Sequence, residues 1–509
     1  MLGLLLACTP SDTTADFTSG DLSEGTNPDT PHDPGDTIPL EDTGELEPVE
    51  MASAEADILI AVMLDTYRGD WMMDEGFTEP LASHLQDDGW SIYPASTTSN
   101  WTWPAIRLMA TGCGFFSNLE DPQGSCEAFT VSEHSDQSVG DIPLLPSLIN
   151  AKTFVLSNSL LWDDFHSDVC QNFNDQGGVC EVQKAQIDGL KGNDILIDRA
   201  LELRDTLSAA RDEHGKAVMF LHVFGPHEMY EYHPEFGECV LDTAMLPEDW
   251  EDFVIPRDTP LPELLSQIYQ DENEQEFGAA QETLLSYYRC VYETDLAHTN
   301  AQVSRLLEGL GAEWMAENRA MVMLYNDHGE QWGEVHPDSS VPQSGIYANG
   351  HGRSVVYDNV TGGFGGMWIP WWEGTLPKTA EVHRLSAEDL WQTAFYHLNI
   401  DAPPRMEGVV IGTTPLDTPA FSAAVDVESQ LALVRAVWHT DDGDRSLVCT
   451  LYLPGAVQCE GYENLDEYSD QLNGQPAWDS TTFGVVWPEM RQKLLSVGER
   501  QGWTGSLPE

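Results

Sequence analysis

Basic residues are scarce in this chain of 509 residues. It contains 22 Lys and Arg against 86 Asp and Glu, which gives a formal net charge of −64 at pH 7. Residues 9–50 hold twelve of the acidic side chains, so the remainder of the chain is acidic as well. Such a surface repels nucleic acid and anionic membranes, which excludes DNA and RNA as expected partners. The acidity otherwise indicates only solubility.

Long apolar runs are also absent, and no stretch of the sequence suits a membrane span. The N-terminal MLGLLLAC is short, and it lacks the basic start of an ordinary signal peptide. Apolar and small residues before a Cys resemble the bacterial lipoprotein signal. We therefore expect residues 1–8 to be such a signal, truncated at its start, with Cys8 lipidated. The expected location is the bacterial cell envelope, held by that lipid anchor. Ordinary secretion or the periplasm is the alternative.

Metal-thiolate spacing of the C-x-x-C type is missing, although the chain has nine Cys. Without Cys8 eight remain, an even number that suits disulfides in an exported protein. Eight cysteines allow 105 connectivities. Pairing between neighbours in the sequence would join Cys113 to Cys126, Cys170 to Cys180, Cys239 to Cys290 and Cys449 to Cys459. Free buried thiols, which would suit a cytosolic enzyme, are the alternative.

The organisation changes sharply after the N-terminal region. Residues 9–55 contain few large apolar groups, which predicts a disordered acidic linker. Short apolar runs typical of buried strands then occur at 57–64, 153–158, 217–224, 320–325 and 366–370. Helical patterns lie between them at 79–87, 103–111, 193–210, 281–309 and 386–398. This alternation predicts an α/β fold with a mostly parallel central sheet flanked by helices on both faces.

The last part of the chain has a different pattern. Residues 432–440 and 446–454 are typical of a hairpin, and 487–500 of an amphipathic helix. We expect residues 416–509 to form a small C-terminal sheet-plus-helix subdomain.

Polar side chains follow several of the predicted strands. Ligands in parallel α/β sheets collect at the carboxyl ends of strands, so these positions matter most. Asp and His are also common turn and cap residues, so each one alone favours an ordinary structural role. Several from different strands indicate a site. The segments are 65–70, 225–230, 326–330 and 349–352.

The stretch STTSNWTWPAIRLMATG, residues 96–112, predicts the start of a helix. Thr102 is a good N-cap residue, and Pro104 suits a first helical turn. A helix cap is therefore one interpretation of Thr102. The alternative is a chemical role, which the order of the other motifs supports.

The motifs occur in the following order along the chain. An apolar strand precedes Asp-Thr-x-Arg-x-Asp, and then come Thr-x-Pro with Thr-Gly, His-x-x-Tyr, Asp-His-Gly-Glu and His-Gly-x-Ser-x-x-Tyr. This order resembles the sulfatase family of the alkaline phosphatase superfamily. The resemblance spans about residues 56–415 and implies a sulfatase-like catalytic domain there. It also implies a metal-dependent hydrolase of phosphoric or sulfuric esters.

The resemblance makes Thr102 the nucleophile. Sulfatases have a Cys or Ser there, which is oxidised to formylglycine in a Cys-x-Pro-x-Arg setting. Thr102 cannot form that aldehyde, and Ile106 replaces the Arg, with Arg107 one residue late. Threonine nucleophiles occur in phosphodiesterases and envelope phosphoethanolamine transferases of the superfamily. A phosphoester is therefore the favoured substrate over a sulfate ester.

The resemblance also implies a metal site. Asp65, Asp327, His328 and the Thr102 hydroxyl would bind one divalent ion. Thr66 stands where sulfatases have a second Asp, and a His ligand favours zinc or manganese over calcium. His227 and His351 match positions that contact the ester oxygens or the leaving group, and one of them is the candidate general acid. The candidate substrate-binding residues are Arg68, Arg107, His222 and Tyr230.

Two other functions stay open. An envelope transferase that moves a phospho-substituent onto glycan or lipid would use the same motifs, but such transferases usually carry several membrane spans. A non-catalytic binding protein that retains the fold would show a lost metal ligand, and all four positions are filled. The expected substrate is a small-molecule, glycan or lipid ester, with membrane contact only through the anchor. Five Trp are candidates for a pocket lining or for core packing: Trp101, Trp103, Trp368, Trp371 and Trp372.

Overall fold

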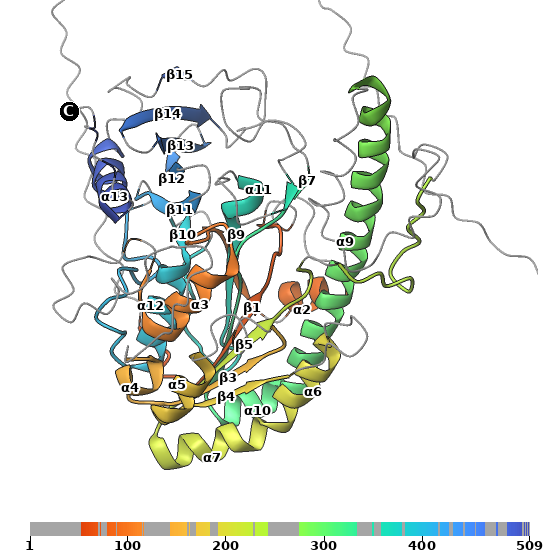
Figure 1. Cartoon of the computed structure of the whole chain (residues 1–509). Helices are drawn as coiled ribbons and strands as arrows, with labels where there is room; N and C mark the ends of the chain where they lie inside the picture. Colours follow the sequence, from red (N-terminus) through yellow and green to blue (C-terminus); the bar gives the residue numbers. More distant parts are fainter. Residues whose placement is uncertain are drawn as a thin grey trace, which may run out of the picture. The chain divides into compact units, whose positions relative to one another are not determined.

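The structure is a computed structural model of the whole chain (Figure 1). The residues that it describes are 52–69, 72, 79–87, 89–114, 116, 143–159, 162, 169–183, 192–227, 230–242, 274–332, 349–350, 358–378, 382–415, 418–426, 431–440, 443–452, 455–463, 475–476, 486–500, 503, 505 and 507. The expectations for residues 1–8, Cys8, Cys126 and His351 lie outside these residues, as does most of the linker 9–55.

The central sheet has eight strands in the order β10-β2-β9-β6-β1-β5-β3-β4. Strand β9 runs antiparallel to its neighbours β2 and β6, and the other neighbouring pairs are parallel. The prediction of a mostly parallel sheet is therefore confirmed. The strands are β1 Ile58–Leu64, β2 Ser91–Ser96, β3 Lys152–Ser157, β4 Val179–Val182, β5 Ala217–Val223, β6 Ala320–Asn326, β9 Gly362–Trp368 and β10 Leu385–Ser386.

Helices cover both faces of this sheet, as the buried strand pattern predicts (Figure 1). One face packs against α3 Thr102–Thr111, α4 Leu145–Leu148, α5 Val169–Asp175 and α12 Ala387–Leu398. The other face packs against α2 Leu81–Asp87, α6 Asn193–Glu202, α7 Arg204–His214, α9 Glu274–Leu310 and α10 Ala312–Glu317. Successive residues of β1 alternate between these two cores, since side chains of a strand point to opposite faces.

The helix expected at 193–210 is instead two helices. Helix α6 ends at Glu202 and α7 begins at Arg204, with Leu203 between them. The apolar positions Leu196, Leu203 and Leu207 all lie in one buried cluster across this break. The hydrophobic repeat therefore continues through the interruption, which is why the sequence pattern could not reveal it.

A second, antiparallel sheet follows in the order β11-β12-β13-β14-β15. Its strands are β11 Ala420–Asp426, β12 Leu431–Thr440, β13 Gly443–Tyr452, β14 Ala456–Glu463 and β15 Gln475–Pro476. Helix α13, Trp487–Arg500, shares a core with β12 and β13. The expected hairpin and closing helix are confirmed, whereas the domain boundary between 415 and 416 stays a prediction.

The small sheet contacts the segment that leads into α3. Ser99 forms a bridge with Ala423 of β11, and its hydroxyl donates to the carbonyl of that residue at 2.7 Å. The Ser422 hydroxyl donates to the carbonyl of Thr97. The small sheet therefore fixes the chain three to five residues before Thr102. A short pair of strands, β7 Gln331–Trp332 and β8 Asn349–Gly350, and helix α11 Asp358–Thr361 complete the described elements.

Three of the expected disulfides are present. Cys170–Cys180 joins α5 to β4, Cys239–Cys290 joins the segment after β5 to α9, and Cys449–Cys459 joins β13 to β14. The fourth expected pair includes Cys126, which is not among the described residues.

Among the helices of the described part, none combines the length and the apolar character that a bilayer crossing needs.

Candidate active site

The ends of two neighbouring strands bring the predicted metal ligands close together. Asp65 follows β1, while Asp327 and His328 follow β6, and Leu64 of β1 pairs in register with Asn326 of β6. One ligand atom from each of these three residues lies within 4.8 Å of the other two. All three side chains are buried. The strand-end argument therefore predicted which residues converge.

Thr102 is the first residue of α3, and its hydroxyl does not cap the helix. The N-cap is Trp101, in an extended conformation and without a side-chain capping bond. The Thr102 hydroxyl lies 3.2 Å from Asp65 Oδ1 and 3.1 Å from His328 Nε2. The structure therefore rejects the cap interpretation, because the hydroxyl points at the carboxylate cluster rather than at the helix backbone.

The hydrogen bonds of His328 define its tautomer. Its Nδ1 lies 2.8 Å from the carbonyl oxygen of Gly329, which can only accept, so Nδ1 carries the proton. In the neutral ring Nε2 then presents a lone pair toward the Thr102 hydroxyl. That nitrogen can accept a proton or bind a cation.

The two carboxylates are held by different donors. Asp327 Oδ1 accepts from the backbone N–H groups of Thr66 at 3.0 Å and His328 at 2.8 Å. Asp327 Oδ2 is buried and accepts no hydrogen bond. Asp65 Oδ1 accepts from the hydroxyl of Thr66 at 2.9 Å, and its Oδ2 faces His222. Thr66 thus bonds both carboxylates, although it stands where sulfatases have an acid.

The pKa values of the two carboxyls move in opposite directions. Burial alone would raise the pKa of Asp65, but the nearby charge of His227 and the hydrogen bond from His222 lower it well below its usual range. Burial and the charge of Asp65 raise the pKa of Asp327 well above its usual range. Two facing carboxylates cannot both ionise without a counter-charge.

This charge conflict indicates a cation site. His328 Nε2, which carries the lone pair, lies 3.4 Å from Asp327 Oδ2 and 3.5 Å from Asp65 Oδ1. Asp327 Oδ2 is buried and has no hydrogen-bond donor. Two carboxylates, one imidazole and a hydroxyl are a donor set that suits a divalent transition-metal ion. Asp65, Thr102, Asp327 and His328 therefore fit the expected ion.

His222 does not lie where a substrate-binding residue is expected. The indole N–H of Trp162 donates to His222 Nδ1 at 3.1 Å, so the ring proton is on Nε2, which donates to Asp65 Oδ2 at 2.8 Å. The ring is fully buried on β5. With both nitrogens engaged by protein, His222 orients Asp65 rather than contacting a substrate, which corrects the substrate-binding assignment. Trp162 carries no sequence signal that links it to this site.

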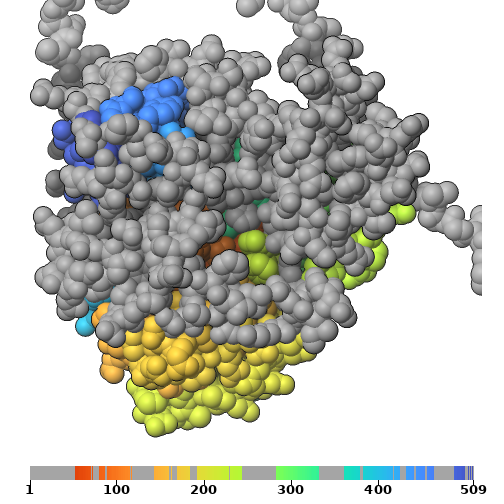
Figure 2. All heavy atoms as spheres, viewed as in Figure 1, coloured from red at the N-terminus to blue at the C-terminus, as the bar shows by residue number. Residues whose placement is uncertain are grey.

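The segment after β5 brings His227 and Tyr230 near the cluster. The His227 ring stacks on Phe224 at 4.3 Å between centroids, and its charge acts on Asp65. The Tyr230 hydroxyl donates to Glu330 Oε2 at 2.5 Å. In Figure 2, residues of the β1–α3 region (red-brown) and of this segment (yellow-green) reach the surface next to each other. His351, the other candidate acid, lies outside the described residues.

The two candidate arginines are both buried. Arg68 is on the turn after β1, and its backbone N–H donates to the Tyr292 hydroxyl at 3.0 Å. Arg107 lies on α3, while Ile106 points into the hydrophobic core. Of the five Trp, Trp103 and Trp368 are core residues, which favours the packing interpretation for those two.

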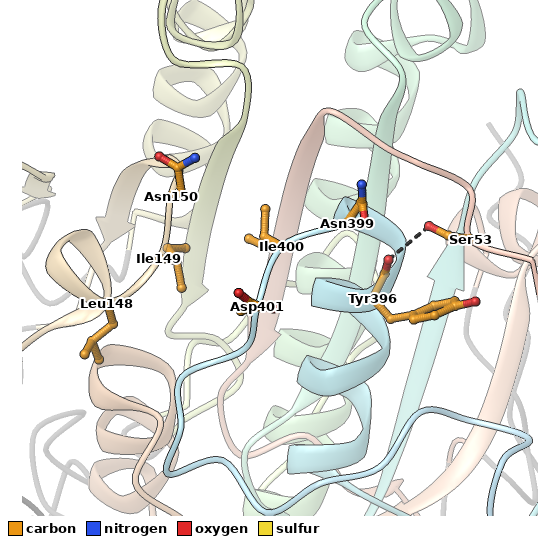
Figure 3. Close-up of a pocket in the computed structure, with 8 residues that line it drawn as sticks. All are labelled: Ser53, Leu148, Ile149, Asn150, Tyr396, Asn399, Ile400 and Asp401. Atoms are coloured by element: carbon orange, nitrogen blue, oxygen red, sulfur yellow. Dashed lines mark hydrogen bonds between the residues drawn. The ribbon is translucent and has the colours of Figure 1, made fainter.

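A cavity of about 510 Å³ lies elsewhere (Figure 3). Ser53 precedes β1 and Asn150 precedes β3, so the cavity is at the amino ends of the strands, opposite Asp65. The Ser53 hydroxyl donates to the Tyr396 carbonyl across it at 3.0 Å. Ligands of such sheets bind at the carboxyl ends, so this cavity has no part in the site.

Comparison with solved structures identifies the fold. BT4656, solved with its substrate D-glucosamine-2-N,6-O-disulfate, superposes with a TM-score of 0.54 at 15% identity, over 88% of this chain and 98% of that one. A Bacteroides thetaiotaomicron protein assigned as a sulfatase gives 0.53 at 14% identity, over 88% and 93%. The chain has a sulfatase-like fold.

The phosphonate monoester hydrolase of Agrobacterium radiobacter shares this sulfatase-like fold. It superposes with a TM-score of 0.52 at 12% identity, over 87% of this chain and 96% of that one. No protein-family model matches the chain, and no curated protein is similar to it in sequence. The sulfatase-like fold thus covers enzymes that act on different esters.

Proposed function

We propose that this chain is a metal-dependent hydrolase of phosphoric or sulfuric esters, with Thr102 as its nucleophile and phosphoesters as its better substrates. The observation that carries the proposal is the position of the Thr102 hydroxyl. It lies at the N-terminus of α3, within hydrogen-bond distance of Asp65 Oδ1 and His328 Nε2. A threonine hydroxyl is a weak nucleophile unless a base or a metal activates it.

The residues around Thr102 supply the remaining requirements. Its hydroxyl proton has two acceptors in reach, and the N-terminus of α3 favours an anion there. Asp65, Thr102, Asp327 and His328 would hold the ion, zinc or manganese rather than calcium. When bound, such an ion lowers the pKa of the hydroxyl and neutralises charge on the ester oxygens. His227, next to Asp65, or His351 exchanges a proton with the leaving group.

The residue type at position 102 favours phosphoryl over sulfuryl chemistry. Formylglycine releases sulfate through its hemiacetal, a route that a threonine ester lacks. A sulfo-threonine would need attack by water at sulfur. A phospho-threonine can be hydrolysed in the same site that forms it, with the same acid and base groups. The substrate is then a small-molecule, glycan or lipid ester and not a nucleic acid.

The compartment belongs to the same proposal. Three disulfides suit an oxidising compartment, and we place the protein outside the cytoplasm, in the periplasm or on the cell envelope. Its membrane contact is a lipid on Cys8.

An ester panel with metal analysis tests this function. The purified chain and Thr102→Ala are compared on aryl phosphate, aryl phosphodiester, aryl phosphonate and aryl sulfate, with metal content measured on each preparation. We expect a phosphorus ester to be the best substrate and Thr102→Ala to be inactive on all four. Aryl sulfate turned over at least tenfold faster than aryl phosphate would contradict the phosphoester preference. Appearance of the phosphoryl group on an added alcohol or glycan would indicate a transferase instead.

A further inference from the structure

A second group of metal-ligating side chains lies outside the candidate active site. His233 is on the segment after β5, and Asp295 and His298 are on α9. One ligand atom from each lies within 4.8 Å of the other two. Asp295 and His298 are three positions apart on a helix, which places them on the same face, toward His233.

The backbone around this group is fixed without any ion. The N–H of Glu231 donates to Asp295 Oδ2 at 2.9 Å, and the N–H of His233 donates to Thr294 Oγ1 at 3.2 Å. The Cys239–Cys290 disulfide joins the same segment to α9. The ligand atoms are therefore held together by the fold itself, as a preformed site requires.

The two imidazoles carry unused buried nitrogens. His233 Nε2 and His298 Nδ1 are both buried and have no hydrogen-bond partner. Their rings stack with centroids 3.9 Å apart and an angle of 14° between planes. A buried polar atom without a partner destabilises a fold, so two such atoms side by side indicate a missing ligand.

The surrounding charges favour a cation over a water molecule. Asp295 is fully buried. The carboxylate of Glu231, largely buried as well, lies 3.5 Å from His233 Nε2, with Asp295 Oδ1 at 3.9 Å from the same nitrogen. Glu235 approaches the other ring nitrogen at 3.5 Å. A cation bound here would offset the negative charge of these acids.

We propose that His233, Asp295 and His298, with Glu231 as a fourth ligand, bind a divalent transition-metal ion separate from the one at Thr102. Two imidazole nitrogens and carboxylate oxygens form a donor set typical of zinc. Binding through His298 Nδ1 places the ring proton on Nε2. The Gln302 amide nitrogen lies 3.1 Å from that atom and its amide oxygen accepts from Arg305 at 3.0 Å, so binding of the ion requires the Gln302 side chain to turn. The proposal raises the expected metal content by one ion.

The position of this second site gives it a structural role. It ties to α9 the segment that carries His227 and Tyr230, and Tyr230 bonds Glu330, two residues after His328. An ion here would hold the candidate acid against the active site without touching the reacting atoms. Metal binding rather than activity is therefore the measurement that tests it.

The test measures bound Zn²⁺ per chain in four preparations. Each is saturated with Zn²⁺, and the unbound Zn²⁺ is then removed. They are the unmodified chain, His298→Gln, Asp327→Asn and the control His214→Gln, a histidine exposed on α7. We expect His298→Gln and Asp327→Asn each to bind one equivalent fewer than the unmodified chain, and His214→Gln to bind the same number. An unchanged content in His298→Gln would overturn the second site, whatever Asp327→Asn does.

A stability measurement guards against misfolding of a variant. In the Asp327→Asn background, Zn²⁺ should still raise the melting temperature, because the second site remains. Adding His233→Gln or His298→Gln to that background should abolish the rise without lowering the melting temperature in chelator. A rise that persists in both double variants would overturn the site. Loss of the rise in Asp327→Asn alone would overturn it as well.

Discussion

The hydroxyl of Thr102 lies 3.1 Å from Nε2 of His328, although 226 residues separate the two in the chain. One residue begins a helix and the other follows a central strand, so only the fold brings them together. Because His328 holds its proton on Nδ1, the nitrogen that faces Thr102 is basic. The relationship makes Thr102 a candidate nucleophile instead of a helix cap.

Thr102→Ala should abolish turnover while the chain remains folded. The hydroxyl makes no capping bond, so the loss in stability should stay near that of a single hydrogen bond, about 1 kcal/mol. Thr102→Ser keeps the hydroxyl and should retain measurable activity. The check is turnover of the best ester alongside thermal unfolding. Near-normal activity of Thr102→Ala would show that the hydroxyl has no chemical role.

Asp327→Asn should lower bound metal and activity together. Burial and the charge of Asp65 raise the pKa of Asp327, so Asn resembles the neutral form that the fold favours when no ion is present. Stability in chelator should therefore stay at least as high as that of the unmodified chain. Metal analysis and unfolding in chelator check both parts. Full occupancy of the Thr102 site in this variant would refute Asp327 as a ligand.

His222→Gln should weaken metal binding at Asp65 by about 10- to 100-fold, the usual cost of losing a residue that orients a ligand. Its Nε2–H currently donates to Asp65 Oδ2. The matched control is His397→Gln, a buried histidine whose ring accepts from the Ala54 N–H at the other end of the sheet. Metal titration of the two variants separates the roles. Equal metal affinities in them would mean that His222 only fills space.

Glu388 should make stability depend on pH. Burial, followed by the charge of Glu407, raises its folded-state pKa from 4.5 to about 7. The folded state then holds the proton more tightly than the unfolded state. This contribution is therefore fully present below pH 4.5 and is lost as pH rises to about 7. A shift of that size corresponds to about 3 kcal/mol.

Glu388→Gln removes this titration. The variant should melt higher than the unmodified chain at pH 8, and the difference should shrink toward pH 4.5. Glu313→Gln, an exposed substitution on α10, is the control and should change neither value. An unchanged melting temperature for Glu388→Gln at pH 8 would show that this carboxyl ionises without cost in the fold.

The sequence predicted the cluster because strand ends are visible in it. The apolar runs before Asp65 and Asp327 mark two buried strands, and parallel neighbours place their following residues together. The partnership of Trp162 with His222 could not be predicted in this way. It depends on which face of β5 a side chain takes and on what packs there, and both are settled only by the tertiary structure.

Two features could not be predicted from the local sequence pattern: the start of one strand and one group of side chains. Strand β9 begins at Gly362, four residues before the predicted run, because its glycines give no apolar signal. The His233, Asp295 and His298 group was also missed. His233 lies more than sixty residues before the other two, and only Asp295 and His298 on α9 have a helical spacing that could have drawn attention.

Acid trapping on Thr102 tests the central claim most directly. The chain is mixed with its best phosphoester, quenched at low pH and digested, and the peptide that contains Thr102 is analysed by mass spectrometry. The account predicts an added phosphoryl group on Thr102 that is absent from Thr102→Ala and from a sample without ester. Steady turnover of the ester with no phosphorylation of Thr102, under conditions that trap a known phospho-enzyme, would contradict it.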